Sequence, residues 1–253
     1  MVKLDVKNYF GNKVKQMKKS VFITGLRDGI PIALGYLAVS FSFGIAAVAA
    51  GLSPLEALLI SMTNLTSAGQ FAGIGIITAG GSYFELAISQ FIINLRYSLM
   101  GISLSQRLDK SFTRGKRAVL GHALTDEIFG VAVSRTKPVT PWYFFGLALL
   151  PYVGWSVGTG LGAVFGELLG ETLRDALSVA IYGMFIAIII PEAKSSIKMT
   201  AIIMLAILIS CMLYYIPIFN FISDGFAIIL CAVIASAVGA LAFPIKEENN
   251  GGR

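Results

Sequence analysis

The sequence is poor in residues that carry metal and acid–base chemistry. It has one histidine, His122, and two cysteines, Cys211 and Cys231. A single histidine argues against a metal site and against histidine-based catalysis. Both cysteines lie in apolar runs without a CxxC spacing, so we expect free, buried thiols. We therefore expect no metal, no cofactor and no enzymatic activity.

Charged residues are also scarce, at 13% of the chain, whereas hydrophobic residues make up 56% and the mean hydropathy is +0.78. This composition places the chain among membrane proteins and excludes a soluble domain. No GxGxxG or Walker-type loop is present, so the chain does not hydrolyse ATP by itself. The net charge of +6 does not indicate a nucleic-acid partner, because the basic residues lie in an N-terminal arm and in loops beside apolar spans.

The expected fold is an all-α integral membrane protein embedded in the lipid bilayer, with about seven or eight transmembrane helices. We expect a basic cytoplasmic arm over residues 1–19, a single transmembrane transporter domain over 20–245, and a disordered tail over 246–253. The arm is rich in lysine and is expected to lie on anionic headgroups. The expected spans are about 30–50, 54–79, 83–106, 141–165, 173–190, 199–216 and 219–243, the first starting near Asp28 and Pro31.

The segment 118–134 is either a short span or a helix that enters the membrane and turns back. By the positive-inside rule, the lysine and arginine residues place the N-terminal arm on the cytoplasmic side. With eight crossings, the loop 107–117 lies outside despite its five basic residues. A re-entrant hairpin on either side would relieve this violation.

A weak internal repeat appears when the chain is shifted by 114 residues, which sets Phe41–Gly44 on Trp155–Gly158 and Gly69–Phe71 on Gly183–Phe185. Such halves are typical of transporters with a site between them. Glycine and phenylalanine are abundant here, so chance alignment is the alternative.

The second span is expected to be broken. Three glycines between Ser67 and Gly75 weaken the helix in mid-membrane, and such a break is tolerated only inside protein or beside a water-filled cavity. The alternative is that these glycines serve helix packing alone.

The third span carries Asn94 and Arg96 near its middle, where an arginine costs about 2.5–3.5 kcal/mol on insertion scales. Such residues usually mark function. The alternatives are a structural ion pair for Arg96 and interhelical hydrogen bonds for Asn94 and Gln70.

Four motifs together resemble the AzlC family: Thr66–Ala72, Asn94–Gly101, Thr125–Glu127 and Trp155–Gly160. The resemblance covers roughly residues 20–245 and extends to the order and spacing of the motifs. It implies the large subunit of a bacterial branched-chain amino-acid exporter in the cytoplasmic membrane, working with a small AzlD-type membrane subunit. The implied substrates are leucine, isoleucine and valine, with methionine or toxic analogues as further candidates. Relatives often have histidine after the arginine, so Tyr97 argues against a proton role at that position.

The chemistry of the residues is compatible with such a substrate. A zwitterionic amino acid needs donors for its carboxylate, acceptors for its ammonium group and an apolar pocket. Backbone amides after Ser67 and Gly69 suit the carboxylate through the helix dipole. Gln70 and Asn94 are expected to assist. Broken-helix carbonyls, Asp126 or Glu127 are candidate acceptors, and the expected pocket residues are Phe71, Tyr97 and Trp155.

Arg96 has two candidate roles: direct contact with the substrate carboxylate, or an ion pair with Asp126 or Glu85 that breaks as the protein changes state. We favour the ion pair, because a carboxylate bound permanently to arginine would slow release. Under proton coupling, Asp126 or Glu127 is the titrating group. The alternative for these two acids is an interfacial pair on a short helix.

A second class of function fits the same features. The broken second span resembles a filter of the kind found in an ion or small-solute channel. A carrier saturates and shows counterflow, whereas a channel does neither.

Overall fold

The computed structural model describes residues 2–168, 186, 189–190 and 193–243. In this part of the chain every regular element is a helix, and the sole β-type contact is a bridge between Leu108 and Val139. The all-α prediction is therefore confirmed for the described residues. Two compact units are present: Met1–Phe71 with Asn94–Ile181, and Ala72–Ile93 with Tyr182–Arg253.

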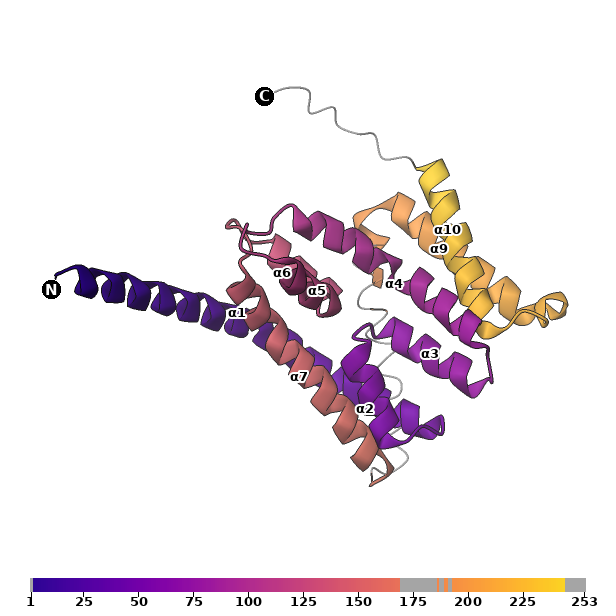
Figure 1. Cartoon of the computed structure of the whole chain (residues 1–253). Coiled ribbons are helices and arrows are strands. Elements are labelled where there is room, and N and C mark those ends of the chain that lie inside the picture. Colours follow the sequence, from indigo (N-terminus) through magenta and orange to yellow (C-terminus); the bar gives the residue numbers. More distant parts are fainter. Residues whose placement is uncertain (1, 169–185, 187–188, 191–192, 244–253) are drawn as a thin grey trace. The chain divides into compact units, whose positions relative to one another are not determined.

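The first unit is built on two long helices, α1 (Val2–Ala49) and α7 (Pro141–Phe165), which lie side by side and run in the same direction (Figure 1). Their backbones approach closely at glycines. A Cβ added at Gly162 would lie 1.9 Å from the Phe41 carbonyl oxygen, and one at Gly44 would lie 2.2 Å from the Thr159 carbonyl oxygen. The helix over 141–165 is thus closely packed against α1 at Gly162.

The helix of the first span does not start near residue 30, so the prediction of a helix start at Asp28 and Pro31 is wrong. α1 is continuous from Val2, Pro31 lies inside it, and its membrane-length apolar part is Lys15–Ala49. The reason lies in the packing, because α7 already accompanies α1 at Gly25, where an added Cβ would meet the Tyr143 carbonyl oxygen at 2.2 Å. These contacts hold the helix together through the proline, which alone would weaken it.

The second span is broken, as predicted, but not where it was expected. α2 (Pro54–Thr63) begins with a capping box between Ser53 and Glu56. α3 (Ala68–Thr78) contains all three glycines in helical conformation. The break therefore lies at residues 64–67, before the glycines rather than within them.

The next part of the chain gives one long and two short helices. α4 (Tyr83–Ser105) matches the expected third span closely. The segment 118–134 forms two helices, α5 (Arg114–His122) and α6 (Asp126–Val133), separated by three non-helical residues. A 3₁₀ turn, η1 (Gly166–Leu168), follows α7.

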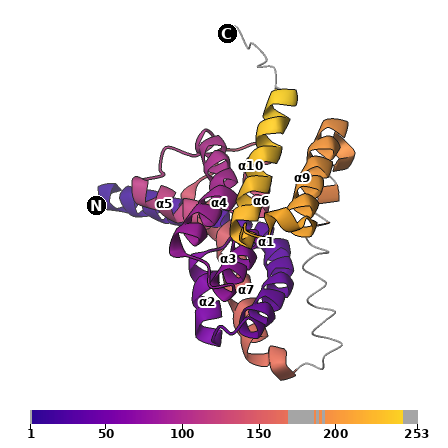
Figure 2. The same ribbon diagram turned by 90° about the vertical axis from the view of Figure 1, so that its right-hand side faces the viewer.

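In the second unit, α9 (Ile197–Tyr215) and α10 (Asp224–Ala242) pack side by side, linked through the turn η2 (Pro217–Phe219) (Figure 2). The Cys231 thiol donates to the Ala206 carbonyl oxygen at 3.3 Å. Both cysteines are free, as expected, but Cys211 is exposed on α9, so its predicted burial is wrong. α9 is apolar and has no residue buried within the described protein, so its surface is suited to contact with lipid.

Four of the described helices are long and apolar enough to cross a membrane: Lys15–Ala49, Pro141–Phe165, Ile197–Tyr215 and Gly225–Ala242. The predicted number of about seven or eight crossings is not confirmed. Most of the expected span 173–190, the tail 246–253 and the repeat partner of Gly69–Phe71 lie outside the described residues.

Candidate functional site

The first part of the candidate site is the helix break at residues 64–67, between α2 and α3. The Thr66 hydroxyl donates to Asn64 Oδ1 at 2.8 Å, which folds the chain locally after α2. Ser67 has φ 51°, a left-handed conformation that is uncommon for a residue other than glycine. Its Oγ is buried and has no hydrogen-bond partner in the part of the chain that the structure describes. A strained residue with an unused polar atom at the start of α3 is typical of a functional position.

Gln70, one turn into α3, ties the break to its neighbours. Its Nε2 donates to Ser61 Oγ at 2.8 Å, and its Oε1 accepts from Trp155 Nε1 at 2.9 Å. Ser61 Oγ also lies 2.6 Å from Thr159 Oγ1. Gln70 is 1% exposed and Trp155 is 3% exposed. Both polar ends of Gln70 are therefore occupied by protein, and in this state the amide holds α2, α3 and α7 together.

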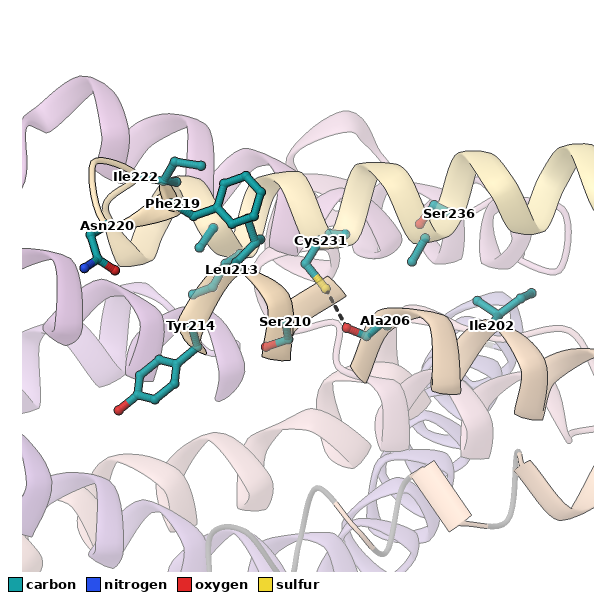
Figure 3. A pocket seen from close by; sticks show the side chains of 14 residues that line it. Ile202, Ala206, Ser210, Leu213, Tyr214, Phe219, Asn220, Ile222, Cys231 and Ser236 are labelled. Atoms are coloured by element: carbon teal, nitrogen blue, oxygen red, sulfur yellow. Dashed lines mark hydrogen bonds between the residues drawn. The ribbon is translucent and has the colours of Figure 1, made fainter. Parts of the chain in front are cut away.

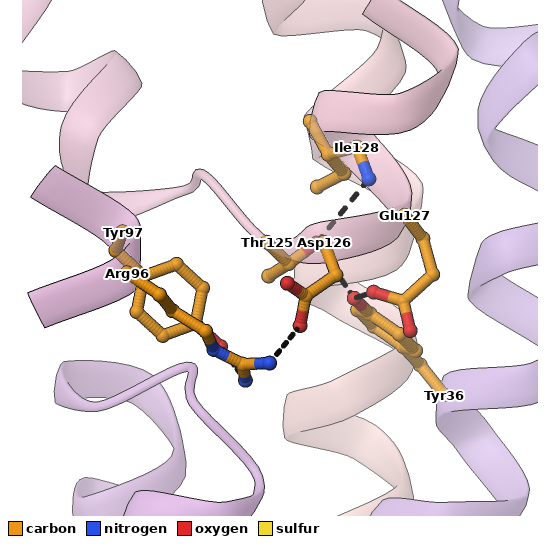
Figure 4. Close-up of polar contacts among 7 residues, drawn as sticks. All are labelled: Tyr36, Arg96, Tyr97, Thr125, Asp126, Glu127 and Ile128. Carbon is orange, nitrogen blue, oxygen red and sulfur yellow. Dashed lines mark hydrogen bonds and ion pairs between the residues drawn. The ribbon is translucent and has the colours of Figure 1, made fainter. Parts of the chain in front are cut away.

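The second break, between α5 and α6, lies beside the same part of α7. Thr125 caps α6 by accepting from the Ile128 amide at 3.4 Å. The Tyr36 hydroxyl of α1 lies 2.7 Å from Thr125 Oγ1 and also hydrogen-bonds the Glu127 carboxylate (Figure 4). The Tyr36 ring packs edge-on against Trp155 with centroids 5.1 Å apart. A chain of contacts therefore links the second break to the first.

Arg96 of α4 forms an ion pair with Asp126 at the start of α6, with Nη1 and Oδ2 2.9 Å apart (Figure 4). Arg96 Nη2 also donates to the Tyr97 hydroxyl at 3.1 Å, and the guanidinium carbon lies 4.9 Å from the Tyr97 ring centroid. The two side chains of the pair are 45% and 38% exposed. Much of this ion pair is therefore not covered by protein. Because a charged pair is costly in hydrocarbon, we expect the uncovered side of the pair to face water.

Of the other predicted residues, Phe71 packs edge-on against Phe43, with ring centroids 5.2 Å apart, and Gly69 is buried in the first turn of α3. Asn94 lies half-buried on α4, two residues before Arg96. Glu85 is buried in the second unit, where it accepts a hydrogen bond from the Ser223 hydroxyl. Of the two carboxylates considered as partners for Arg96, the ion pair in the structure is with Asp126.

Sequence reasoning missed several members of this cluster. Tyr36 joins α1 to α6, and Ser61 with Thr159 joins α2 to α7. The signal was present, because a tyrosine hydroxyl or paired hydroxyls in membrane-length apolar runs must find a partner. The single histidine, His122, also belongs here, because its ring nitrogen lies 3.1 Å from the Met62 carbonyl oxygen. That contact joins the end of α5 to the end of α2.

The second unit contains a groove of about 750 Å³ between α9 and α10 (Figure 3). Its walls are mainly apolar, with Ser210, Tyr214, Asn220 and Ser236 as polar members. None of its lining residues is charged, so it offers no counter-charge to a zwitterion. We therefore place the candidate site at the two helix breaks of the first unit and not in this groove.

The two breaks combine complementary groups. α3 begins beside Trp155, and α6 begins beside Tyr36, whose ring packs on Trp155. The N-terminus of a helix carries a partial positive charge that favours an anion. Arg96 adds a full positive charge, whereas Asp126 and Glu127 supply carboxylates. Among the described residues no three potential metal ligands come together. The arrangement is suited to a small molecule that carries both a negative and a positive group.

Comparison with known proteins gives a family match and several relatives. The family model described as "AzlC protein" matches residues 31–169. "Inner membrane protein YgaZ" of Escherichia coli K12 is 31% identical over 144 residues, which cover 55% of this chain and 59% of that protein. "Branched-chain amino acid transport protein AzlC" of Bacillus subtilis 168 is 24% identical over 136 residues, 52% of each chain.

An "Uncharacterized membrane protein" of Archaeoglobus fulgidus is 28% identical over 179 residues, which cover 70% of this chain and 78% of that protein. The chain thus aligns with little more than half of the E. coli and B. subtilis proteins. No solved structure matches the chain.

Proposed function

The chain belongs to the AzlC family of membrane proteins, and from that membership we propose that it is the large subunit of a secondary transporter that exports branched-chain amino acids. It is an integral protein of the cytoplasmic membrane, as the names of its relatives and its apolar helices agree. The proposed substrates are leucine, isoleucine and valine, with methionine and related analogues as further candidates. The observation that carries the proposal is the meeting of two helix breaks beside Trp155, with Arg96, Asp126 and Glu127 at their edges.

The substrate carboxylate is proposed to bind at the start of α3. Ser67 Oγ, which has no hydrogen-bond partner among the described residues, supplies a hydroxyl donor there. The N-terminus of α3 supplies a favourable dipole. The left-handed backbone of Ser67 holds this turn open instead of letting α2 continue into α3. Asn94 is proposed to assist. Gln70 serves indirectly, because its hydrogen bonds to Ser61 and Trp155 fix the position of α3.

The substrate ammonium group is proposed to bind at the carboxylates of α6. Glu127 accepts from the Tyr36 hydroxyl, and Asp126 pairs with Arg96. The remaining acceptor sites on these carboxylates suit an ammonium group, which has three donors and no acceptor. Tyr97 and Trp155 flank the site and Phe71 lies on the same turn as Gln70, which supplies apolar surface for a branched side chain.

The Arg96–Asp126 ion pair is proposed to act as the switch. A pair that protein covers only in part contributes little stability, about 0–1 kcal/mol, so its opening is not costly. An arriving ammonium group competes with Arg96 for Asp126, and the freed guanidinium then faces the substrate carboxylate. Binding thus exchanges one charge pair for two, which couples substrate to movement of α4 against α6.

The transporter is proposed to work with a small AzlD-type membrane subunit and to use an ion gradient. Asp126 and Glu127 are the candidate groups for proton coupling. The chain has no nucleotide-binding loop of its own, so the energy comes from the gradient or from the partner.

Efflux of labelled leucine from proteoliposomes tests the proposal. The chain is reconstituted with and without the small subunit, and with or without an imposed proton gradient. We expect efflux that saturates, needs the small subunit, and is accelerated in exchange by unlabelled leucine on the opposite side. Conductance that neither saturates nor depends on leucine would instead support a channel with its filter at residues 64–67.

A further inference from the structure

The α1–α7 pair provides an axis along which other segments of the first unit can be placed. At one end, which we call the arm end, Lys18 lies 5.7 Å from the Trp142 ring centroid. At the other end, which we call the far end, an added Cβ at Gly166 would lie 2.6 Å from Ile45. The helices are parallel and both are long enough to cross the membrane. The two ends therefore lie on opposite faces of the membrane.

The basic loop after α4 lies at the arm end. Its backbone pairs with the residue before Thr140, through Asp109 N to Val139 O and Val139 N to Arg107 O, both at 2.9 Å. Leu104 and Phe112 are buried in the same apolar cluster as Tyr143 of α7. The residues flanking α5 on its N-terminal side thus sit where α7 begins.

The segment after α6 returns to the same place. Arg107 Nη1 donates to the Val133 carbonyl oxygen at 2.9 Å. The Arg135 guanidinium lies 3.7 Å from the Tyr143 ring centroid and 3.8 Å from the Asp28 carboxylate. The Tyr143 hydroxyl donates to that same carboxylate at 2.7 Å. Both ends of the α5–α6 pair are therefore held at the arm end.

The tip of the α5–α6 pair reaches the middle of α7. His122 lies beside the Tyr152 ring, with centroids 6.1 Å apart, and Thr125 contacts Tyr36, which packs on Trp155. α5 has 9 residues and α6 has 8, so at 1.5 Å per residue each is about 12–14 Å long. That length reaches about halfway through a hydrocarbon core of roughly 30 Å.

We propose that α5 and α6 form a re-entrant hairpin that enters and leaves the membrane on the cytoplasmic face. In consequence the loop 107–113 and the segment 134–140 lie on the same face as the N-terminal arm. This placement removes the violation of the positive-inside rule, since the basic residues of both segments become cytoplasmic. At the far end, the described loop residues 50–53 and 166–168 contain no lysine or arginine.

α2 approaches the tip of the α5–α6 pair from the far end. It starts at the far end, where Leu58 lies near Gly160, and reaches the middle, where the Met62 carbonyl oxygen accepts from the Tyr152 hydroxyl. The same carbonyl oxygen lies 3.1 Å from a ring nitrogen of His122. The end of α2 and the tip of the α5–α6 pair therefore meet from opposite faces.

Cysteine accessibility tests this topology without any assay of transport. In the full chain, Cys211 and Cys231 are replaced by serine. Single cysteines are then placed at exposed positions that lie near either the arm end or the far end: Q16C, S111C, K137C, L55C and L168C. A membrane-impermeant maleimide is applied to intact cells and then to permeabilised cells, and labelling is compared with that of the denatured protein. Q16C serves as the arm-end reference, and L55C and L168C serve as two independent far-end references.

We expect Q16C, S111C and K137C to react only after permeabilisation, and the far-end references to react in intact cells. Reaction of S111C and K137C from opposite faces would show that α5–α6 crosses the membrane and would overturn the proposal. Reaction of both from the face of the far-end references would overturn it as well. If L55C is shielded by lipid, L168C still reports the far face.

Discussion

Replacing Gly162 by alanine tests how closely α1 and α7 are packed. The added Cβ would lie 1.9 Å from the Phe41 carbonyl oxygen, 2.8 Å from its carbonyl carbon and 3.0 Å from its Cα. These are backbone atoms that cannot turn away, so the helices must separate by about 1.5 Å to restore ordinary contact. Such overpacking costs about 1–3 kcal/mol. In a chain of this length each kcal/mol lowers the melting temperature by about 2–4 °C, so we expect a loss of about 2–12 °C.

Gly160→Ala is the matched control, because it makes the same change two residues away on the same helix. Its added Cβ would meet only Leu58 Cδ1, at 4.0 Å, and the gain in helix propensity is the same. The apparent melting temperature of both purified variants is measured in detergent by size-exclusion after heating. Equal melting temperatures for the two variants would refute the close approach of α1 and α7 on which the arrangement of the site rests.

Three further predictions concern the contacts between the helix breaks. Trp155→Phe leaves the buried Gln70 Oε1 without its donor and should lower the free energy of unfolding by about 1–3 kcal/mol. Adding Gln70→Leu to this variant should recover part of the loss, and the melting temperatures of the single and double variants test this. Tyr36→Phe keeps the ring on Trp155 but removes the hydroxyl from Glu127, so we expect near-normal melting with leucine transport reduced at least about tenfold, about 1.4 kcal/mol. Ser67→Gly relieves a left-handed backbone conformation that costs about 1–2 kcal/mol, so the variant should melt no lower than the wild type. It should bind leucine more weakly because the hydroxyl is lost, and equal leucine affinity would contradict the proposed role of Ser67.

Long helices flanked by clear signals were well predicted. Thr140 and Pro141 mark the start of α7, since the Thr140 hydroxyl caps the helix and proline suits its first position. α4 likewise follows its apolar run from Tyr83. By contrast, Pro31 carries a strong local signal for a helix start, but packing against α7 overrides it.

The break in the second span shows why local signals fail in a membrane bundle. Glycines normally weaken a helix, yet in α3 they are helical, and at Gly73 an added Cβ would already lie 3.4 Å from Gln90. The break is placed instead by the Thr66–Asn64 hydrogen bond and the left-handed Ser67, and serine has no sequence signature for that conformation. The Arg96–Asp126 contact was within reach of sequence reasoning, because charges in apolar runs seek partners. The Tyr36 contacts depend on how α1 packs, which spacing alone does not reveal.

The region around Arg96 and Asp126 is proposed to be the transport site for an amino acid. Leucine counterflow in proteoliposomes tests it directly with Arg96→Gln and Asp126→Asn, and with Asp109→Asn as the control. Asp109 lies in the loop after α4, where the Ser111 side chain and backbone hold the pKa of its carboxyl below the usual range, and asparagine keeps the oxygen that accepts from the Ser111 amide. We predict that the first two variants lose at least about tenfold in counterflow rate, about 1.4 kcal/mol, while the control transports normally. Wild-type counterflow in all three variants, at equal membrane insertion, would place the site elsewhere.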